Sequence, residues 1–174
     1  KLTQDMIRFL ADQTWGTREF TLANGMRVDL GQDGKNFPLV SFTGVIQEKY
    51  GLDVFTCTLD QVKEQLKLHK IEVEKTENRS RGIDKLWKKI RAELTGPAFL
   101  IDIPDFLQPL AKVRQDDPRY SEQFNLLLGG TEACKAYSEL NDPVRQLNNF
   151  VEQQAMRDEG DDEAMMMDID YVEA

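Results

Sequence analysis

Residues 124–142 read FNLLLGGTEACKAYSELND, and this stretch decides the fold that we predict. The apolar run 126–128 is typical of a buried strand, and Gly129-Gly130 lets two backbones approach closely. From Lys135 onward the residue types alternate, which predicts a second strand. The stretch therefore predicts two neighbouring strands of one sheet.

The second predicted strand has two different faces. One face is small and mostly apolar, as expected for a sheet that packs against other elements. The other carries an amine, a phenol, a carboxylate and an amide, which predicts the floor of a polar pocket. An antiparallel strand whose outer face contacts water is the alternative. The polar face consists of Lys135, Tyr137, Glu139 and Asn141, and the apolar face of Cys134, Ala136, Ser138 and Leu140.

Four stretches together resemble one family. They are SRGIDKLWKKI at 80–90, PAFLIDIPDFLQPLAK at 97–112, GGTEACKAYSELNDPVRQ at 129–146 and GDDEAMMMDIDYVEA at 160–174. In this order they resemble the part of class II lysyl-tRNA synthetases between the second and third class II motifs. The resemblance is dense from about residue 80 to the end and thinner before it.

The resemblance implies an α+β fold, with an antiparallel β-sheet flanked by helices. On this interpretation residues 1–174 are a partial catalytic domain, with a small helical insertion at 53–78. The sequence starts at Lys1 and not at Met, and it stops at Ala174 inside a stretch that reads as a helix. Both ends are therefore expected to be truncated.

The resemblance also implies a binding site. Selecting lysine requires a buried carboxylate for the substrate ammonium, together with groups that fix the chain length. Glu139 matches that acid, Tyr137 matches the aromatic residue beside it, and Lys135 lies on the same face. Glu132 matches a glutamate that faces ATP and Mg²⁺, with Asn125 beside it. No catalytic residue is assigned within these residues.

Two positions depart from the family pattern. Relatives usually read RFE where this chain has Gln123-Phe124-Asn125, so an amide replaces a carboxylate that faces the metal. Relatives usually carry Asn where this chain has Lys135. A lysine there could repel a substrate lysine, or it could bind the substrate carboxylate or a phosphate.

Composition limits the other function classes. A formal net charge of −9 argues against this segment holding nucleic acid by itself. No apolar run approaches membrane-spanning length, so no membrane partner is expected. Cys57 and Cys134 lack metal-ligand spacing, which is typical of reduced thiols in a cytoplasmic protein. The single histidine, His69, is expected to have a surface or packing role.

The function implied for the full-length parent is that of a lysine–tRNA ligase. It would bind lysine, ATP, Mg²⁺ and tRNA and form a homodimer, whereas the present residues alone would be inactive and could self-associate. Two alternatives stay open. One is a paralogue that attaches lysine-like groups to a protein, and the other is a catalytically dead binding or regulatory module, indicated by Asn125 and Lys135.

Local signals predict where several elements begin. Asn24-Gly25 predicts a type I′ hairpin turn, and Thr58 with Gln61 predicts a capping box. Asp142-Pro143 predicts a helix whose apolar stripe includes Val144, Leu147, Phe150 and Val151. Other helix starts are predicted at Thr3, Thr43 and Ser80, and at the acidic run 161–163.

Overall fold

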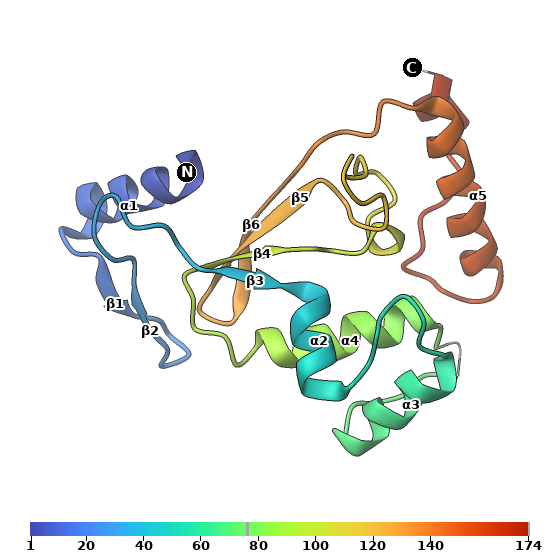
Figure 1. Ribbon diagram of the computed structural model, residues 1–174, viewed down its shortest axis with the longest axis horizontal. Coiled ribbons are helices and arrows are strands. Elements are labelled where there is room, and N and C mark those ends of the chain that lie inside the picture. The colour runs from blue at the N-terminus through green and yellow to red at the C-terminus, as the bar shows by residue number, and fades with distance from the viewer. Residues whose placement is uncertain (76, 174) are drawn as a thin grey trace.

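The computed structural model of the chain describes residues 1–75 and 77–173 (Figure 1). Residue 76, which falls in the predicted insertion, and residue 174 lie outside the described residues. The elements in chain order are α1 (Leu2–Trp15), β1 (Glu19–Thr21), β2 (Arg27–Asp29), β3 (Leu39–Ser41), α2 (Phe42–Tyr50), α3 (Leu59–Leu68), α4 (Arg79–Arg91), β4 (Ala98–Ile101), the short helix η1 (Asp105–Leu107), β5 (Gln123–Leu128), β6 (Thr131–Tyr137), α5 (Pro143–Asp158) and α6 (Ile169–Glu173).

The main sheet has the strand order β3-β4-β5-β6. β5 runs antiparallel to both of its neighbours, β4 and β6, whereas β3 is parallel to β4, with Leu39 opposite Phe99. The α+β prediction is confirmed, but the prediction of an antiparallel sheet needs correcting at this one strand. The chain between β3 and β4 passes through α2, α3 and α4, and such a long helical crossover brings a strand back in the same direction.

The β5–β6 hairpin turns at the two glycines. Leu128 pairs with Thr131, so Gly129 and Gly130 form a two-residue loop, with φ of 59° and 80°. A type I′ turn requires positive φ at both central positions, which glycine adopts without steric cost. A Cβ at Gly129 would lie 1.9 Å from Leu22 Cδ1, so close packing also requires glycine there.

The prediction of a type I′ turn at Asn24-Gly25 is wrong. Gly25 has a φ of 83°, but Asn24 is not among the described residues with positive φ. The Gly25 N–H donates to the Leu22 carbonyl at 2.9 Å, so the loop is one residue longer and ends in a left-handed glycine. The Asn24 amide instead donates to the Gly129 carbonyl at 2.9 Å, which ties the two hairpins together.

The sheet separates two hydrophobic cores because successive strand residues point to opposite faces. Leu100 and Leu127 join the core built with α2, α3 and α4, which lie on one side of the sheet in Figure 1. Phe99 and Leu126 join the second core, formed with α1 and the β1–β2 hairpin. The polar pocket side chains lie on the α4 face of the sheet.

The predicted insertion contains α3, which begins at the predicted capping box. The Thr58 hydroxyl accepts from the Gln61 N–H, and the Gln61 side chain accepts from the Thr58 N–H. Val62 and Leu66 of α3 are fully buried in the same core as α4. The helix is confirmed. That residues 53–78 are an insertion remains a prediction.

The Asp142 cap is confirmed, since its carboxylate accepts from the N–H groups of Val144 and Arg145. Three other predicted starts are wrong by one or two residues. At α2 and α4 a second residue that can cap a helix lies two positions before the predicted one, and the backbone conformation decides which of the two caps the helix, whereas α1 begins without a side-chain cap. The observed N-caps are Lys1 for α1, Ser41 for α2 and Asn78 for α4, in place of starts at Thr3, Thr43 and Ser80.

The apolar stripe of α5 is mostly exposed. Phe150 is buried and contacts Tyr171 of α6, with ring centroids 5.9 Å apart. Val144 and Val151 are 69% and 52% exposed. Among the residues of the predicted apolar stripe, only Phe150 is therefore buried. Of the helices within the described residues, none combines the length and the apolar character that crossing a bilayer demands.

Candidate active-site cavity

A cavity of about 350 Å³ lies on the α4 side of the main sheet. Asn125 of β5 and three residues of β6, namely Glu132, Lys135 and Tyr137, line its sheet wall. α4 forms a second wall, and the segment 161–165 after α5 forms a third. The cavity therefore brings together four of the five side chains that the sequence predicts for the site.

A β-bulge explains why Glu132 and Lys135 share this cavity. Strict alternation would place residues 132 and 135 on opposite faces of β6. The pairing register shifts between Leu126 and Leu127, so Leu126 faces Cys134 whereas Leu127 faces Glu132. A bulge inserts one extra residue and resets the alternation of side chains. It therefore turns Glu132 toward the same side as Lys135.

The Glu132 carboxylate accepts hydrogen bonds from three side chains. One oxygen accepts from Trp87 Nε1 at 2.8 Å and from Arg91 at 3.3 Å. The other accepts from Asn125 Nδ2 at 2.9 Å. Asn125 in turn accepts from Gln123 Nε2 at 2.8 Å. These side chains therefore form a charge-neutral hydrogen-bonded network that joins α4, β5 and β6.

Lys135 lies directly across the strand pair from Asn125. Its ammonium donates to Gln108 Oε1 at 2.6 Å and lies 5.4 Å from the centre of the Tyr137 ring. Desolvation within the concave site lowers the pKa of Lys135 below its ordinary value, although the Glu132 carboxylate acts in the opposite direction. The partner of this ammonium is a neutral amide.

The structure places Glu139 apart from this group. Glu139 follows the end of β6 and is exposed, and it is not among the residues that line the cavity. Its carboxylate accepts from the Tyr171 hydroxyl at 2.7 Å, and this hydrogen bond raises the pKa of Tyr171. Tyr137 separates Glu139 from Lys135 along the chain.

Sequence reasoning missed the partners of Glu132. In the helix that the sequence predicts from Ser80, Trp87 falls on the apolar stripe and Arg91 falls outside it, so the pattern marks neither as a site residue. Their i, i+4 spacing nevertheless places them one above the other on α4, which was the available signal. The tertiary fold then directs both side chains at Glu132.

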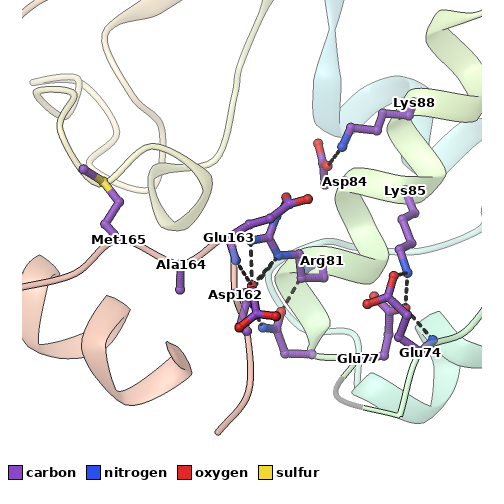
Figure 2. Close-up of polar contacts among 12 residues, drawn as sticks. Glu74, Glu77, Arg81, Asp84, Lys85, Lys88, Asp162, Glu163, Ala164 and Met165 are labelled. Atoms are coloured by element: carbon purple, nitrogen blue, oxygen red, sulfur yellow. Dashed lines mark hydrogen bonds and ion pairs between the residues drawn. The ribbon is translucent and has the colours of Figure 1, made fainter. Parts of the chain in front are cut away.

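An ion pair that sequence reasoning also missed holds the third wall in place. Arg81 of α4 binds Asp161 through two nitrogens, with Nε 2.8 Å and Nη2 2.6 Å from Oδ1. Asn78 donates to the second Asp161 oxygen at 2.8 Å. Figure 2 shows Arg81 directed from α4 toward Glu163, and Lys85 directed toward Glu74 and Glu77.

The acidic run 161–163 was predicted to start a helix. That prediction is wrong, because the next helix, α6, begins at Ile169. Burial raises the pKa of Asp161, but the hydrogen bonds from Arg81 and Asn78 outweigh burial, so the pKa lies below its ordinary value. The acidic side chains are therefore used for a tertiary contact and not for a helix N-terminus.

Glu132 and Asn125 do not fit a magnesium site in this arrangement. The acceptor-only carboxylate of Glu132 fixes the Asn125 amide with its NH₂ group toward Glu132, so the two residues do not present oxygens to one ion. Magnesium requires several oxygen ligands in octahedral geometry. Within residues 1–75 and 77–173, no three histidine, cysteine or acidic side chains lie close enough together to hold a metal ion.

Comparison with known proteins identifies the family. The profile of the class II tRNA synthetases for D, K and N matches residues 1–174, so the chain belongs to this family. The chain is also 39% identical over 173 residues to the lysine–tRNA ligase of Thermotoga maritima, covering 99% of the chain and 34% of the relative.

Other relatives carry the same name. The lysine–tRNA ligases of Fervidobacterium nodosum and Bacillus subtilis are 36% and 32% identical to this chain. Each match covers 99% of the chain, and 33% and 34% of the respective relative. The chain thus spans about a third of the length of the curated relatives that it matches. The resemblance inferred from the sequence is confirmed.

Proposed function

We propose that this chain is part of a lysine–tRNA ligase that activates lysine with ATP and transfers it to tRNA. The protein would be a cytoplasmic homodimer. The observation that carries the proposal is the cavity lined by Asn125, Glu132, Lys135 and Tyr137. The relatives named lysine–tRNA ligase match the chain that contains it over 99% of its length.

The proposed roles follow the chemistry of the side chains. Glu139 would bind the ammonium of the substrate lysine, since a carboxylate is the natural partner of that cation. Tyr137 would pack along the apolar part of the lysine side chain. Because Tyr137 lines the cavity and Glu139 follows two positions later, the lysine would lie across the end of β6.

Glu132 and Asn125 would lie on the nucleotide side. Glu132 would act through its network, because its carboxylate holds the donors of Trp87 and Arg91 in place. The magnesium expected from the sequence would arrive with the phosphates of ATP, since Mg²⁺ is commonly bound through substrate phosphates. In this proposal the chain's own residues position the nucleotide.

The test is ATP–pyrophosphate exchange by the protein in its natural full length. Glu139→Gln keeps the shape but removes the charge, so the KM for lysine should rise roughly ten- to hundredfold while the KM for ATP changes much less. Glu132→Gln should mainly raise the KM for ATP. Exchange that does not depend on lysine would refute the assignment, and so would equal effects of both changes on both substrates.

A non-catalytic synthetase-like module is the second candidate. The observation that favours it is the Glu132 carboxylate, which is already engaged by protein donors. Binding of ATP and lysine without exchange in the full-length protein would support this candidate. Because the chain spans 34% of the Thermotoga maritima relative, we also keep the prediction that these residues alone do not catalyse exchange.

A further inference from the structure

The charged residues that line the cavity are nearly all paired. Arg81 pairs with Asp161 and Glu163, and Glu132 pairs with Arg91. Asp84 pairs with Lys88 at 2.7 Å. Within the part of the chain that the structure describes, Lys135 is the one charged lining residue without an oppositely charged side chain within ion-pair distance. Its only hydrogen-bond partner there is the neutral Gln108.

Lys135 is exposed to solvent, but the cavity walls replace part of the hydration of its ammonium without supplying a counter-charge. A neutral residue at position 135 would avoid this partial desolvation, and the ammonium's interactions with the described residues are the hydrogen bond to Gln108 and the contact with the Tyr137 ring. A ligand that brings a negative charge would remove the imbalance. The cavity is therefore suited to an anionic group beside Lys135.

The residues around Lys135 supply no unpaired cation. The Asn125 amide, directly across the strand pair from Lys135, is neutral, and the arginines Arg81 and Arg91 of α4 are engaged with Asp161 and Glu132. Glu132 and Asn125 do not offer a divalent ion a shared set of oxygens. The residues that line this cavity therefore do not hold a metal ion that could bring positive charge to a ligand. The Lys135 ammonium can supply that positive charge.

We infer that Lys135 binds the anionic oxygen group of a ligand in this cavity, in the role that a metal held by protein carboxylates would otherwise have. The inference rests on the proposed function, which offers two sources of that chemistry. One is the phosphates of the nucleotide, and the other is the carboxylate of the amino acid. In both cases the Lys135 ammonium exchanges its hydrogen bond to Gln108 for an ion pair with the ligand.

The experiment measures binding by calorimetry in the full-length protein. Lys135→Met should weaken ATP binding roughly ten- to hundredfold and leave adenosine unchanged if the phosphates are the source. If the carboxylate is the source, the same change should weaken lysine but not cadaverine, which lacks the carboxylate. Unchanged affinity for both ATP and lysine in a folded Lys135→Met protein would overturn the inference.

Two further variants make the result specific. Lys135→Arg keeps the charge and should retain most of the affinity. Lys67→Met removes an exposed lysine from the end of α3, away from the cavity, and should leave binding unchanged. An equal loss for Lys67→Met and Lys135→Met would point to net charge alone and would contradict a specific contact. Thermal melting by circular dichroism checks that each variant is folded.

A metal measurement tests the other half of the inference. Titration with Mn²⁺ and no nucleotide, followed by electron paramagnetic resonance, should show no protein-bound ion that depends on Glu132. A bound ion that disappears in Glu132→Gln would overturn the claim that these residues do not fit a metal.

One probe separates failure of this inference from failure of the proposed function. If the wild-type protein binds neither ATP nor lysine, the proposed function fails. Inorganic pyrophosphate then tests Lys135 directly, since binding by the wild type that is lost in Lys135→Met supports the anion site. Equal pyrophosphate affinity of the two proteins, or no binding by either, overturns it.

Discussion

Replacing Asp161 with asparagine tests how the third wall of the cavity is held. Asp161 is 9% exposed in its side chain, and its carboxylate accepts from two nitrogens of Arg81 and from Asn78. Asparagine keeps the shape but loses the charge, and its NH₂ group would face a donor. Charge-assisted hydrogen bonds contribute about 1.5–3 kcal/mol and neutral ones about 1. With two bonds weakened, we expect a loss of about 2–3 kcal/mol.

Hydrogen exchange of the backbone amides 160–165 gives the local readout. Two of these amides have backbone partners, since the Asp161 N–H donates to Met156 O of α5 at 3.0 Å and the Ala164 N–H to Asp161 O at 3.1 Å. A loss of about 2–3 kcal/mol corresponds to exchange that is faster by a factor of roughly 30 to 150. Urea denaturation followed by circular dichroism measures the same change globally.

Glu163→Gln is the matched control. Glu163 contacts the same Arg81 but is 73% exposed, and exposed pairs contribute about 0–1 kcal/mol. A control variant as destabilised as Asp161→Asn would refute the argument that burial gives the Arg81–Asp161 pair its strength. Unchanged exchange in Asp161→Asn would refute the role of the pair itself.

The same pair has a pH dependence of known sign. The pKa of Asp161 lies below the ordinary value of 3.8 in the folded state. Its contribution to stability is therefore present above the ordinary value and is lost as the pH falls through the folded-state pKa. The stability curves of the wild type and Asp161→Asn should converge below about pH 4. Curves that stay equally far apart there would contradict this sign.

Three further predictions concern packing, a tyrosine and association. A Cβ on Gly82 would lie 2.4 Å from Val62 Cγ1, so Gly82→Ala should lower the free energy of unfolding by about 1–3 kcal/mol in urea denaturation. Adding Val62→Ala to Gly82→Ala should remove the clash, so the two changes together should cost less than the sum of the single changes; additive costs would contradict the clash. Glu139→Gln should lower the pKa of Tyr171 toward its ordinary value in a spectrophotometric titration, because their hydrogen bond raises it. The 174-residue chain should self-associate through exposed apolar residues such as Phe9, which is 61% exposed. In sedimentation, Phe9→Lys should shift the chain toward the monomer, and a monomeric wild type would contradict the prediction.

The sequence by itself determined the local features of this protein. The glycine pair before β6, the capping box at Thr58 and the Asp142 cap each follow from residues within a few positions of one another. The polar face of β6 follows from simple alternation, and its placement toward a cavity is confirmed for Lys135 and Tyr137. Such signals can be read from the sequence because backbone preferences and side-chain periodicity act over short stretches of chain.

Only the tertiary structure decided how distant residues meet. Alternation alone places Glu132 on the wrong face, and a bulge set by the pairing of β5 with β6 turns it toward Lys135. The pairing of Arg91 with Glu132 and of Arg81 with Asp161 joins residues 41 and 80 positions apart. These contacts depend on the packing of α4 against the sheet and against the segment after α5, which no local pattern encodes. For the same reason, the sequence showed a lysine at position 135, but only the fold showed that its neighbours leave that charge unpaired.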